Sequence, residues 1–123
     1  MIEPKELRPG NWVLGRAKDN PSRFSNEQIS VSDLDSRYKT FLPIPLAVHN
    51  MEVAGFKLLE KDWFEKEVDG TVIAININTG NVAIEDTEKP DTYVPLRPIK
   101  VKSLHQLQNL YYSLTGQELE VSL

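Results

Sequence analysis

Carboxylates are the residues of this 123-residue sequence whose spacing comes closest to that of a chemical site. Paired Asp and Glu side chains can bind Mg²⁺ or Ca²⁺, or act as acid and base when burial drives their pKa values apart. The three groups are Asp33 with Asp35, Glu65 with Glu67 and Asp69, and Glu85 with Asp86 and Glu88. Each group lies in a predicted turn or strand edge among polar neighbours, where carboxylates are normally solvated. A metal-dependent enzyme is therefore the least favoured of three functional hypotheses.

The other residue types offer little for catalysis. The sequence has no cysteine, which excludes disulfides and thiolate metal ligands. Its two histidines, His49 and His105, are far apart in sequence, so a histidine-rich zinc site is not expected. No glycine-rich phosphate loop and no G-x-S-x-G motif is present. The sequence predicts no catalytic residue, no metal and no cofactor.

Basic and aromatic residues near the N-terminus suggest a second hypothesis, nucleic-acid binding. An aromatic ring can stack on a base while neighbouring cations bind phosphate. The candidates are Arg16, Lys18, Arg23 and Phe24, with Trp12 on a nearby predicted strand. The alternative is a solvated loop with one anchoring aromatic ring. Residues 52–91 carry ten acidic and four basic side chains, and the net charge is −4. This acidic balance disfavours a nucleic-acid footprint, which needs clustered Lys and Arg.

A helix is predicted for residues 103–116. Ser103 can cap its start, Gln106 can complete a Ser-x-x-Gln capping box, and Gly116 can end it in a left-handed conformation. The apolar stripe has helical spacing and consists of Leu104, Leu107, Leu110, Tyr111 and Leu114. The opposite side carries His105, Gln108, Asn109 and Tyr112. These four residues form either a solvated helix face or a surface that binds a partner, and they are the candidate binding residues.

Period-two alternation and turn residues predict a β-rich body before this helix. Strands are expected at 11–14, 28–32, 38–42, 72–77, 81–85 and 93–96, with a closing strand or an extended tail at 119–123. Residues 56–68 fit either a strand pair or a bent helix, and a strand pair is favoured because an Asp-Gly turn follows. A long surface loop is expected at 16–27. A short helix is expected at 47–54, with Val48 and Met51 facing inward and Phe56 in the core just beyond it. Asp69-Gly70 predicts a hairpin turn, and Pro95 marks an edge strand.

These elements predict an α+β fold. We expect a small SH3-like N-terminal β module, a short central helix, and an antiparallel β-hairpin sheet covered by the C-terminal helix. The helix is expected to pack on the isoleucine face of the sheet, formed by Ile73, Ile75 and Ile77. The chain is expected to be a single domain, with an N-terminal β part at 1–45 and a helix–hairpins–helix part at 46–123. The prolines at Pro43 and Pro45 mark the boundary.

The sequence predicts a cytoplasmic protein without membrane association. No apolar signal segment follows the N-terminal methionine. No apolar run approaches the roughly 18 residues that a membrane span requires. The lack of cysteine fits a reducing compartment. The sequence leaves the oligomeric state open.

Three stretches carry a resemblance to known sequences. They are Glu6-Leu7-Arg8-Pro9-Gly10-Asn11-Trp12-Val13, Pro43-Ile44-Pro45-Leu46, and residues 105–119 with the pattern His-Gln-Leu-Gln-Asn-Leu-Tyr-x-x-Leu-Thr-Gly-x-Glu-Leu. Together they resemble a family of small uncharacterised proteins from Bacteroidetes bacteria and their phages and prophages. This sequence departs from the family pattern at residues 47–50, where an acidic helix start is usual. The resemblance implies a bacterial or phage-linked intracellular protein, and it implies no activity and no site residues.

The favoured hypothesis is a non-enzymatic accessory protein of a phage or mobile element that acts by binding another protein. It follows from a sequence that provides a complete core and no assembled chemistry. The identity of the protein partner is left open.

Overall fold

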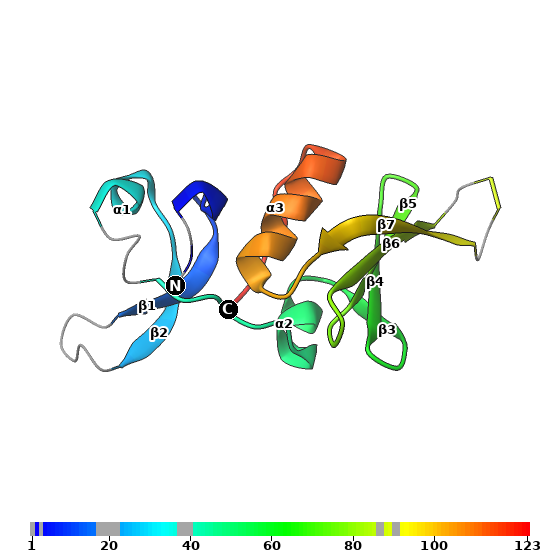
Figure 1. Cartoon of the computed structure of the whole chain (residues 1–123), viewed down its shortest axis with the longest axis horizontal. Coiled ribbons are helices and arrows are strands. Elements are labelled where there is room, and N and C mark those ends of the chain that lie inside the picture. The colour runs from blue at the N-terminus through cyan, green and yellow to red at the C-terminus, as the bar shows by residue number, and fades with distance from the viewer. Residues whose placement is uncertain (1, 3, 17–22, 37–40, 86–87, 90–91) are drawn as a thin grey trace. The chain divides into compact units, whose positions relative to one another are not determined.

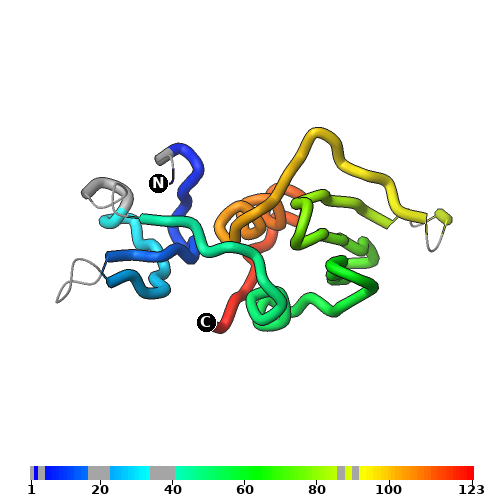
Figure 2. The backbone as a smooth tube through the Cα atoms, turned by 60° about the horizontal axis from the view of Figure 1, so that its bottom comes forward, coloured from blue at the N-terminus to red at the C-terminus, as the bar shows by residue number. Residues whose placement is uncertain are grey.

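The computed structural model describes residues 2, 4–16, 23–36, 41–85, 88–89 and 92–123. The chain forms two compact units, Met1–Pro45 with Ser103–Glu118 and Leu46–Lys102 with Leu119–Leu123. It leaves the first unit after Pro45 and returns to it at Ser103, a path that can be followed along the tube in Figure 2. Both units combine helices and strands (Figure 1), so the predicted α+β class is confirmed.

The first unit contains a two-stranded antiparallel sheet and helical segments. Its elements are η1 (Pro4–Glu6), β1 (Trp12–Arg16), β2 (Phe24–Gln28), α1 (Val31–Ser36) and α3 (Leu104–Thr115). The core cluster consists of Ile2, Leu7, Val13, Ile29 and Phe41. Beside it, Leu14 and Leu42 exchange two backbone hydrogen bonds of 2.8 Å. The described residues of this unit do not confirm the SH3-like barrel expected from the sequence.

The second predicted strand of the first unit was placed wrongly. The strand lies at Phe24–Gln28, of which residues 24–27 belong to the expected surface loop, and Val31 begins a helix and is exposed. The reason is a local capping arrangement, because the Ser30 N–H and hydroxyl both donate to Asp33 Oδ2, at 3.0 and 2.9 Å. This cap overrides the alternating pattern. Most of the third predicted strand, at 38–42, lies outside the described residues.

The second unit is a five-stranded antiparallel sheet whose strands are neighbours in sequence order, with one short helix. Its elements are α2 (Val48–Val53), β3 (Lys57–Glu60), β4 (Trp63–Val68), β5 (Thr71–Asn76), β6 (Asn81–Glu85) and β7 (Tyr93–Lys100). The predicted strands at 56–68, 72–77, 81–85 and 93–96 are thus confirmed. The Asp69-Gly70 turn is also confirmed, with φ of 51° and 84° as a two-residue hairpin of the primed type requires.

The buried side of this sheet is aromatic and aliphatic. Phe64 on β4 pairs with Ile75 on β5, which pairs with Val82 on β6, and all three are nearly inaccessible. Helix α2 contributes Met51, which is fully buried, and Phe56 follows in the core as predicted. Val48 was expected to face inward too, but its side chain is 52% exposed, so that prediction is wrong.

Helix α3 begins and ends where the sequence predicts, after Ser103 and before the left-handed Gly116 at φ 72°. The predicted capping box is absent, because the Ser103 hydroxyl contacts the His105 ring instead of the helix backbone. Leu104, Leu107 and Tyr111 are buried as expected, whereas Leu114 is exposed. The helix belongs to the same compact unit as residues 1–45. The predicted division had instead grouped it with the hairpins, in a part at 46–123.

The C-terminal tail after α3 belongs to the second unit. Residues 119–123 form no strand, which leaves the extended tail of the two alternatives. Leu119 is buried, and the Ser122 N–H approaches the Val53 carbonyl at 3.5 Å. No helix in the described ranges is long and apolar enough to span a membrane.

Candidate functional site

The polar residues of α3 that were expected to bind a partner are instead bonded within the first unit. Gln108 is 2% exposed and its amide connects the helix to the start of β1. Its Oε1 accepts from the Trp12 N–H at 2.7 Å, and its Nε2 donates to the Gly10 carbonyl at 3.1 Å. Buried amides are normally satisfied in this way, so Gln108 has a structural role.

Asn109 makes three further hydrogen bonds to the N-terminal segment. Its Oδ1 accepts from Arg8 Nε at 2.8 Å and from Asn11 Nδ2 at 3.0 Å. Its Nδ2 donates to the Glu6 carbonyl at 2.6 Å. Asn11 is itself almost fully buried, and its Oδ1 accepts from the Arg8 N–H at 2.7 Å. The Asn109 amide is therefore the centre of a network that holds α3 against residues 6–11.

Arg8 completes this network on its outer side. One guanidinium nitrogen donates to Glu118 Oε1 at 2.7 Å and another reaches Glu118 Oε2 at 3.2 Å. The guanidinium carbon lies 4.5 Å from the centre of the Tyr112 ring, which is a cation–π distance. Tyr112 is the one exposed member of the four predicted binding residues, and its ring already packs against Arg8. The side chains of the predicted binding face thus make contacts within the first unit. The sequence-based expectation differed because it took polar helix residues to be exposed.

His105 lies between a serine and a glutamate, an arrangement that invites comparison with a hydrolase triad. Its Nδ1 is 3.0 Å from Ser103 Oγ, and its Nε2 is 3.7 Å from Glu6 Oε1. Ser103 is 4% exposed and His105 2%, so no substrate carbonyl reaches the hydroxyl. Burial lowers the pKa of His105 below its usual 6.5, and the nearby Glu6 carboxylate opposes that shift only in part. The ring is a neutral, structural group.

The predicted nucleic-acid residues are brought together in part. Arg16 and Phe24 face each other across β1 and β2, and the guanidinium carbon lies 5.8 Å from the ring centre. Arg23 is exposed beside Phe24, and Lys18 lies outside the described residues. Arg16 therefore lies over one face of the Phe24 ring at the outer limit of a cation–π contact. Nucleic-acid binding by this cluster stays a prediction.

The acidic groups are not assembled into a site among the residues that the structure describes. In those ranges, no three His, Asp or Glu side chains converge closely enough to hold a metal ion. Asp33 caps α1 through Ser30, and Glu65 accepts a hydrogen bond of 2.8 Å from the Tyr93 hydroxyl. Asp86 lies outside the described residues.

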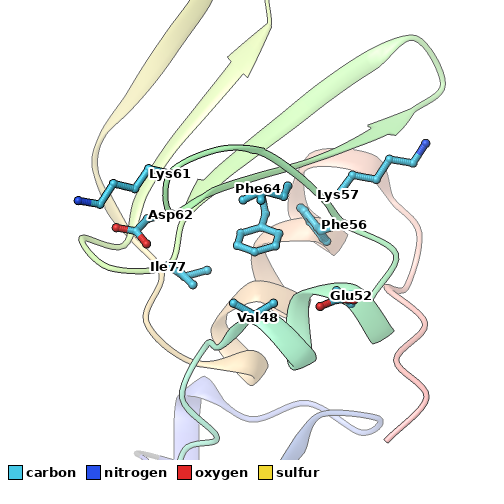
Figure 3. A pocket seen from close by; sticks show the side chains of 9 residues that line it. Val48, Glu52, Phe56, Lys57, Lys61, Asp62, Phe64 and Ile77 are labelled. Carbon is cyan, nitrogen blue, oxygen red and sulfur yellow. The ribbon is translucent and has the colours of Figure 1, made fainter.

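A hollow that carries exposed apolar side chains lies in the second unit, between α2 and strand β3. It is a groove of about 740 Å³. Its apolar lining consists of Val48, Phe56, Leu58, Phe64 and Ile77 (Figure 3). Glu52, Lys57, Lys61 and Asp62 form its rim. In Figure 3 the Phe64 ring and Val48 point toward each other across the groove, while the ammonium groups of Lys57 and Lys61 point away at opposite ends.

Strand β3, beside this groove, is an edge of the sheet with unusually exposed leucines. Leu58 is 65% exposed and Leu59 43%. Sequence analysis placed a strand here but did not single out these residues. The sequence does contain a signal of exposure. Adjacent leucines on one strand point to opposite faces, so a sheet with a single buried face leaves at least one of them exposed. Which strand becomes the edge depends on pairing, and pairing is not visible in the local sequence.

No protein-family model, curated protein or solved structure matches this chain. The resemblance to Bacteroidetes and phage proteins therefore stays a prediction.

Proposed function

We propose that this chain is a non-enzymatic protein-binding module, and that an extended segment of its partner binds along β3 as a sixth strand of the sheet. Peptides bind exposed sheet edges in this manner by main-chain hydrogen bonds, while pockets beside the edge select side chains. The single observation that carries the proposal is the exposed pair Leu58 and Leu59 on an edge strand that borders an apolar groove.

The two edges of the sheet differ in a way that favours β3. Strand β7, at the other edge, contains Pro95 and Pro98, which cannot donate to an added strand. Strand β3 contains no proline, so its outer backbone groups can accept a partner. It is short, it has a bulge between Leu58 and Glu60, and Lys57 lies at its start. A short strand, a bulge and an edge lysine all protect a sheet edge from pairing with other chains. Exposed leucines give no such protection, so they need another explanation.

The groove gives the added strand a place for apolar side chains. Leu58 pairs with Phe64 across β3 and β4, so an added strand next to Leu58 extends the same face. Side chains on that face would cover Leu58 and enter the groove above Val48. A four-residue edge supports few main-chain hydrogen bonds, so we expect a dissociation constant of roughly 1 μM to 1 mM. Transient interactions in this range suit an accessory protein.

The accessory role in a phage or mobile element is part of the same proposal and is supported by the resemblance described above. A cytoplasmic location is also part of it, supported by the absence of cysteine. The genes that neighbour this one test the first of these statements, because phage structural or replication genes beside it are the expected finding.

The binding mode is tested with a displayed library of random heptapeptides selected on the immobilised full chain. A selected peptide is then titrated into ¹⁵N-labelled protein, and the expected result is shifts of β3 and α2 resonances. Leu58→Asp should weaken binding at least tenfold. Val94→Asp is the matched control, because Val94 is 50% exposed on the opposite edge strand β7, and it should leave binding within twofold.

Two outcomes would contradict the proposal. One is a selection that enriches no peptide. The other is a selected peptide whose shifts map away from β3 and whose affinity is unchanged by Leu58→Asp.

A further inference from the structure

A second, smaller hollow lies on the opposite face of the same sheet. It has a volume of about 220 Å³ and is lined by Leu59, Glu60, Trp63, Ala74, Ala83 and Tyr93. Ala74 on β5 and Ala83 on β6 are paired in register and nearly inaccessible. Two alanines between larger side chains leave a depression in the sheet surface. The hollow is thus built into the sheet by the choice of residue at each register position.

The chemistry of this hollow suits a cation. Trp63 and Tyr93 supply aromatic rings, whose faces attract ammonium and guanidinium groups. Glu60 supplies a carboxylate, and none of the six lining residues is basic. Glu65 shares the face because it pairs with Ala74, and its Oε2 accepts a hydrogen bond of 2.8 Å from the Tyr93 hydroxyl. This bond fixes the phenol ring and leaves a second carboxylate beside the hollow.

The wider charge distribution acts in the same direction. Residues 52–91, which include four of the five strands that build this sheet, carry ten acidic and four basic side chains. The resulting field attracts cationic segments and repels acidic ones. Charge complementarity therefore selects a basic group as the occupant of the hollow.

Strand β3 lies between the two hollows. Leu58 lines the apolar groove on one face, and Leu59 lines the hollow with Glu60, Trp63 and Tyr93 on the other. Side chains of a strand added at β3 alternate between these faces, because successive residues of a strand point in opposite directions. An apolar side chain would meet the groove, and the next side chain would lie over Leu59 and Glu60, within reach of Trp63 if it is long.

We propose that the partner segment has alternating apolar and basic residues, and that a lysine or arginine of that segment binds over Trp63, Tyr93 and Glu60. This inference rests on the strand-addition function proposed above and adds the class of side chain that the partner must carry. Apolar residues of the segment contact the groove, and the basic residue gives the interaction its selectivity and its dependence on salt.

The peptide selection tests this inference directly. Alternation of apolar residues with Lys or Arg should be more frequent in the enriched heptapeptides than in the starting library. In such peptides a basic residue lies next to an apolar residue or two positions from another basic one. Replacing the basic residue of a selected peptide with norleucine, which keeps the aliphatic stem, should weaken binding about three- to tenfold at low salt. Titration of the labelled protein should shift the Trp63 indole N–H with the parent peptide and less with the norleucine peptide.

Protein variants supply the matched comparison. Glu60→Gln should weaken the parent peptide about two- to fivefold and leave the norleucine peptide unchanged. Glu67→Gln removes the same charge from the same face of the sheet, on β4, but Glu67 does not line the hollow, so it should have little effect. Equal effects of the two substitutions would show that the basic residue responds to the overall negative charge of the sheet and does not bind in the hollow. That result would overturn the inference.

The remaining outcomes separate the two proposals. Peptides that shift β3 resonances but carry no basic residue overturn this inference and leave strand addition standing. A selection that enriches no peptide overturns both.

Discussion

Replacing Asn109 with alanine tests whether the polar network of the first unit holds α3 in place. The substitution removes the two hydrogen bonds that Asn109 Oδ1 accepts from Arg8 and Asn11, and the one that Nδ2 donates to the Glu6 carbonyl. It also leaves Asn11 Nδ2, in a side chain that is 1% exposed, without this acceptor. Alanine has no polar atom that can take over any of these bonds.

The expected cost follows from the burial of these partners. Each hydrogen bond contributes about 0.5–1.5 kcal/mol net, and a buried donor left unsatisfied costs about 1–3 kcal/mol. Three lost bonds therefore destabilise the unit by about 3 kcal/mol. Alanine is a better helix former than asparagine by about 0.6 kcal/mol, which offsets part of this loss. We expect the free energy of unfolding of the first unit to fall by about 2–3 kcal/mol.

The two tryptophans make this measurable, because Trp12 lies in the first unit and Trp63 in the second. In a Trp63→Phe background, Trp12 fluorescence during urea unfolding reports on the first unit alone. Asn26→Ala is the control, since Asn26 is exposed on β2 and its loss should change stability by less than about 0.5 kcal/mol. A similarly small change for Asn109→Ala would show that water replaces the network at little cost, and the structural role assigned to these residues would be wrong.

Two further predictions concern a buried imidazole and a crowded turn. Because burial lowers the pKa of His105, the unfolded chain takes up a proton below pH 6.5 that the folded chain does not, so stability should fall as the pH drops from 7 to 5. In urea unfolding at each pH, His105→Gln should reduce this slope and His49→Gln should keep it. Gly80→Ala should lower the melting temperature more than Gly70→Ala, because both glycines have positive φ but only a Cβ at Gly80 would lie 3.0 Å from the Val101 carbonyl.

The features that sequence analysis predicted correctly are those encoded within a few residues. The Asp69-Gly70 turn needs two positive φ angles, and few dipeptides supply them. The strand after it alternates clearly, whereas the segment before it was ambiguous by periodicity and was predicted as strands because of the turn. Gly116 ends α3 for a similarly local reason, since a left-handed residue is needed there. The α+β class could be predicted because these local signals are strong and agree with one another.

The features that were missed depend on particular side-chain contacts or on packing that the alternation of apolar residues does not show. Ser30 and Asp33 form a cap that converts an apparent strand into the start of a helix, and the alternation of Ile29 and Val31 concealed it. Val48 has the position of an inward residue on α2, but it lies at an open groove. In neither segment does the periodicity indicate whether another part of the chain covers the apolar side chain.

The most instructive error is the role assigned to the polar side of α3. A periodicity argument treats polar residues as exposed, and His105, Gln108, Asn109 and Tyr112 were accordingly expected to form either a solvated helix face or a surface that binds a partner. Gln108 and Asn109 instead satisfy donors and acceptors of residues 6–12, and His105 is buried beside Ser103. A buried polar network is costly when it is incomplete, so it disfavours other positions of the helix within its unit. The same residues that made the helix look like a binding surface therefore fix its position.

The apolar edge strand β3 is a better binding surface than the polar side of α3. Polar side chains that make several internal hydrogen bonds lose those bonds when they turn toward a partner. Leu58 and Leu59 have no side-chain hydrogen bond to lose on binding, and a partner that covers them removes their apolar surface from water. Binding at β3 therefore costs no internal hydrogen bond of a leucine side chain, and there one exposed leucine borders a groove that suits apolar side chains while the next borders a hollow that suits a cation.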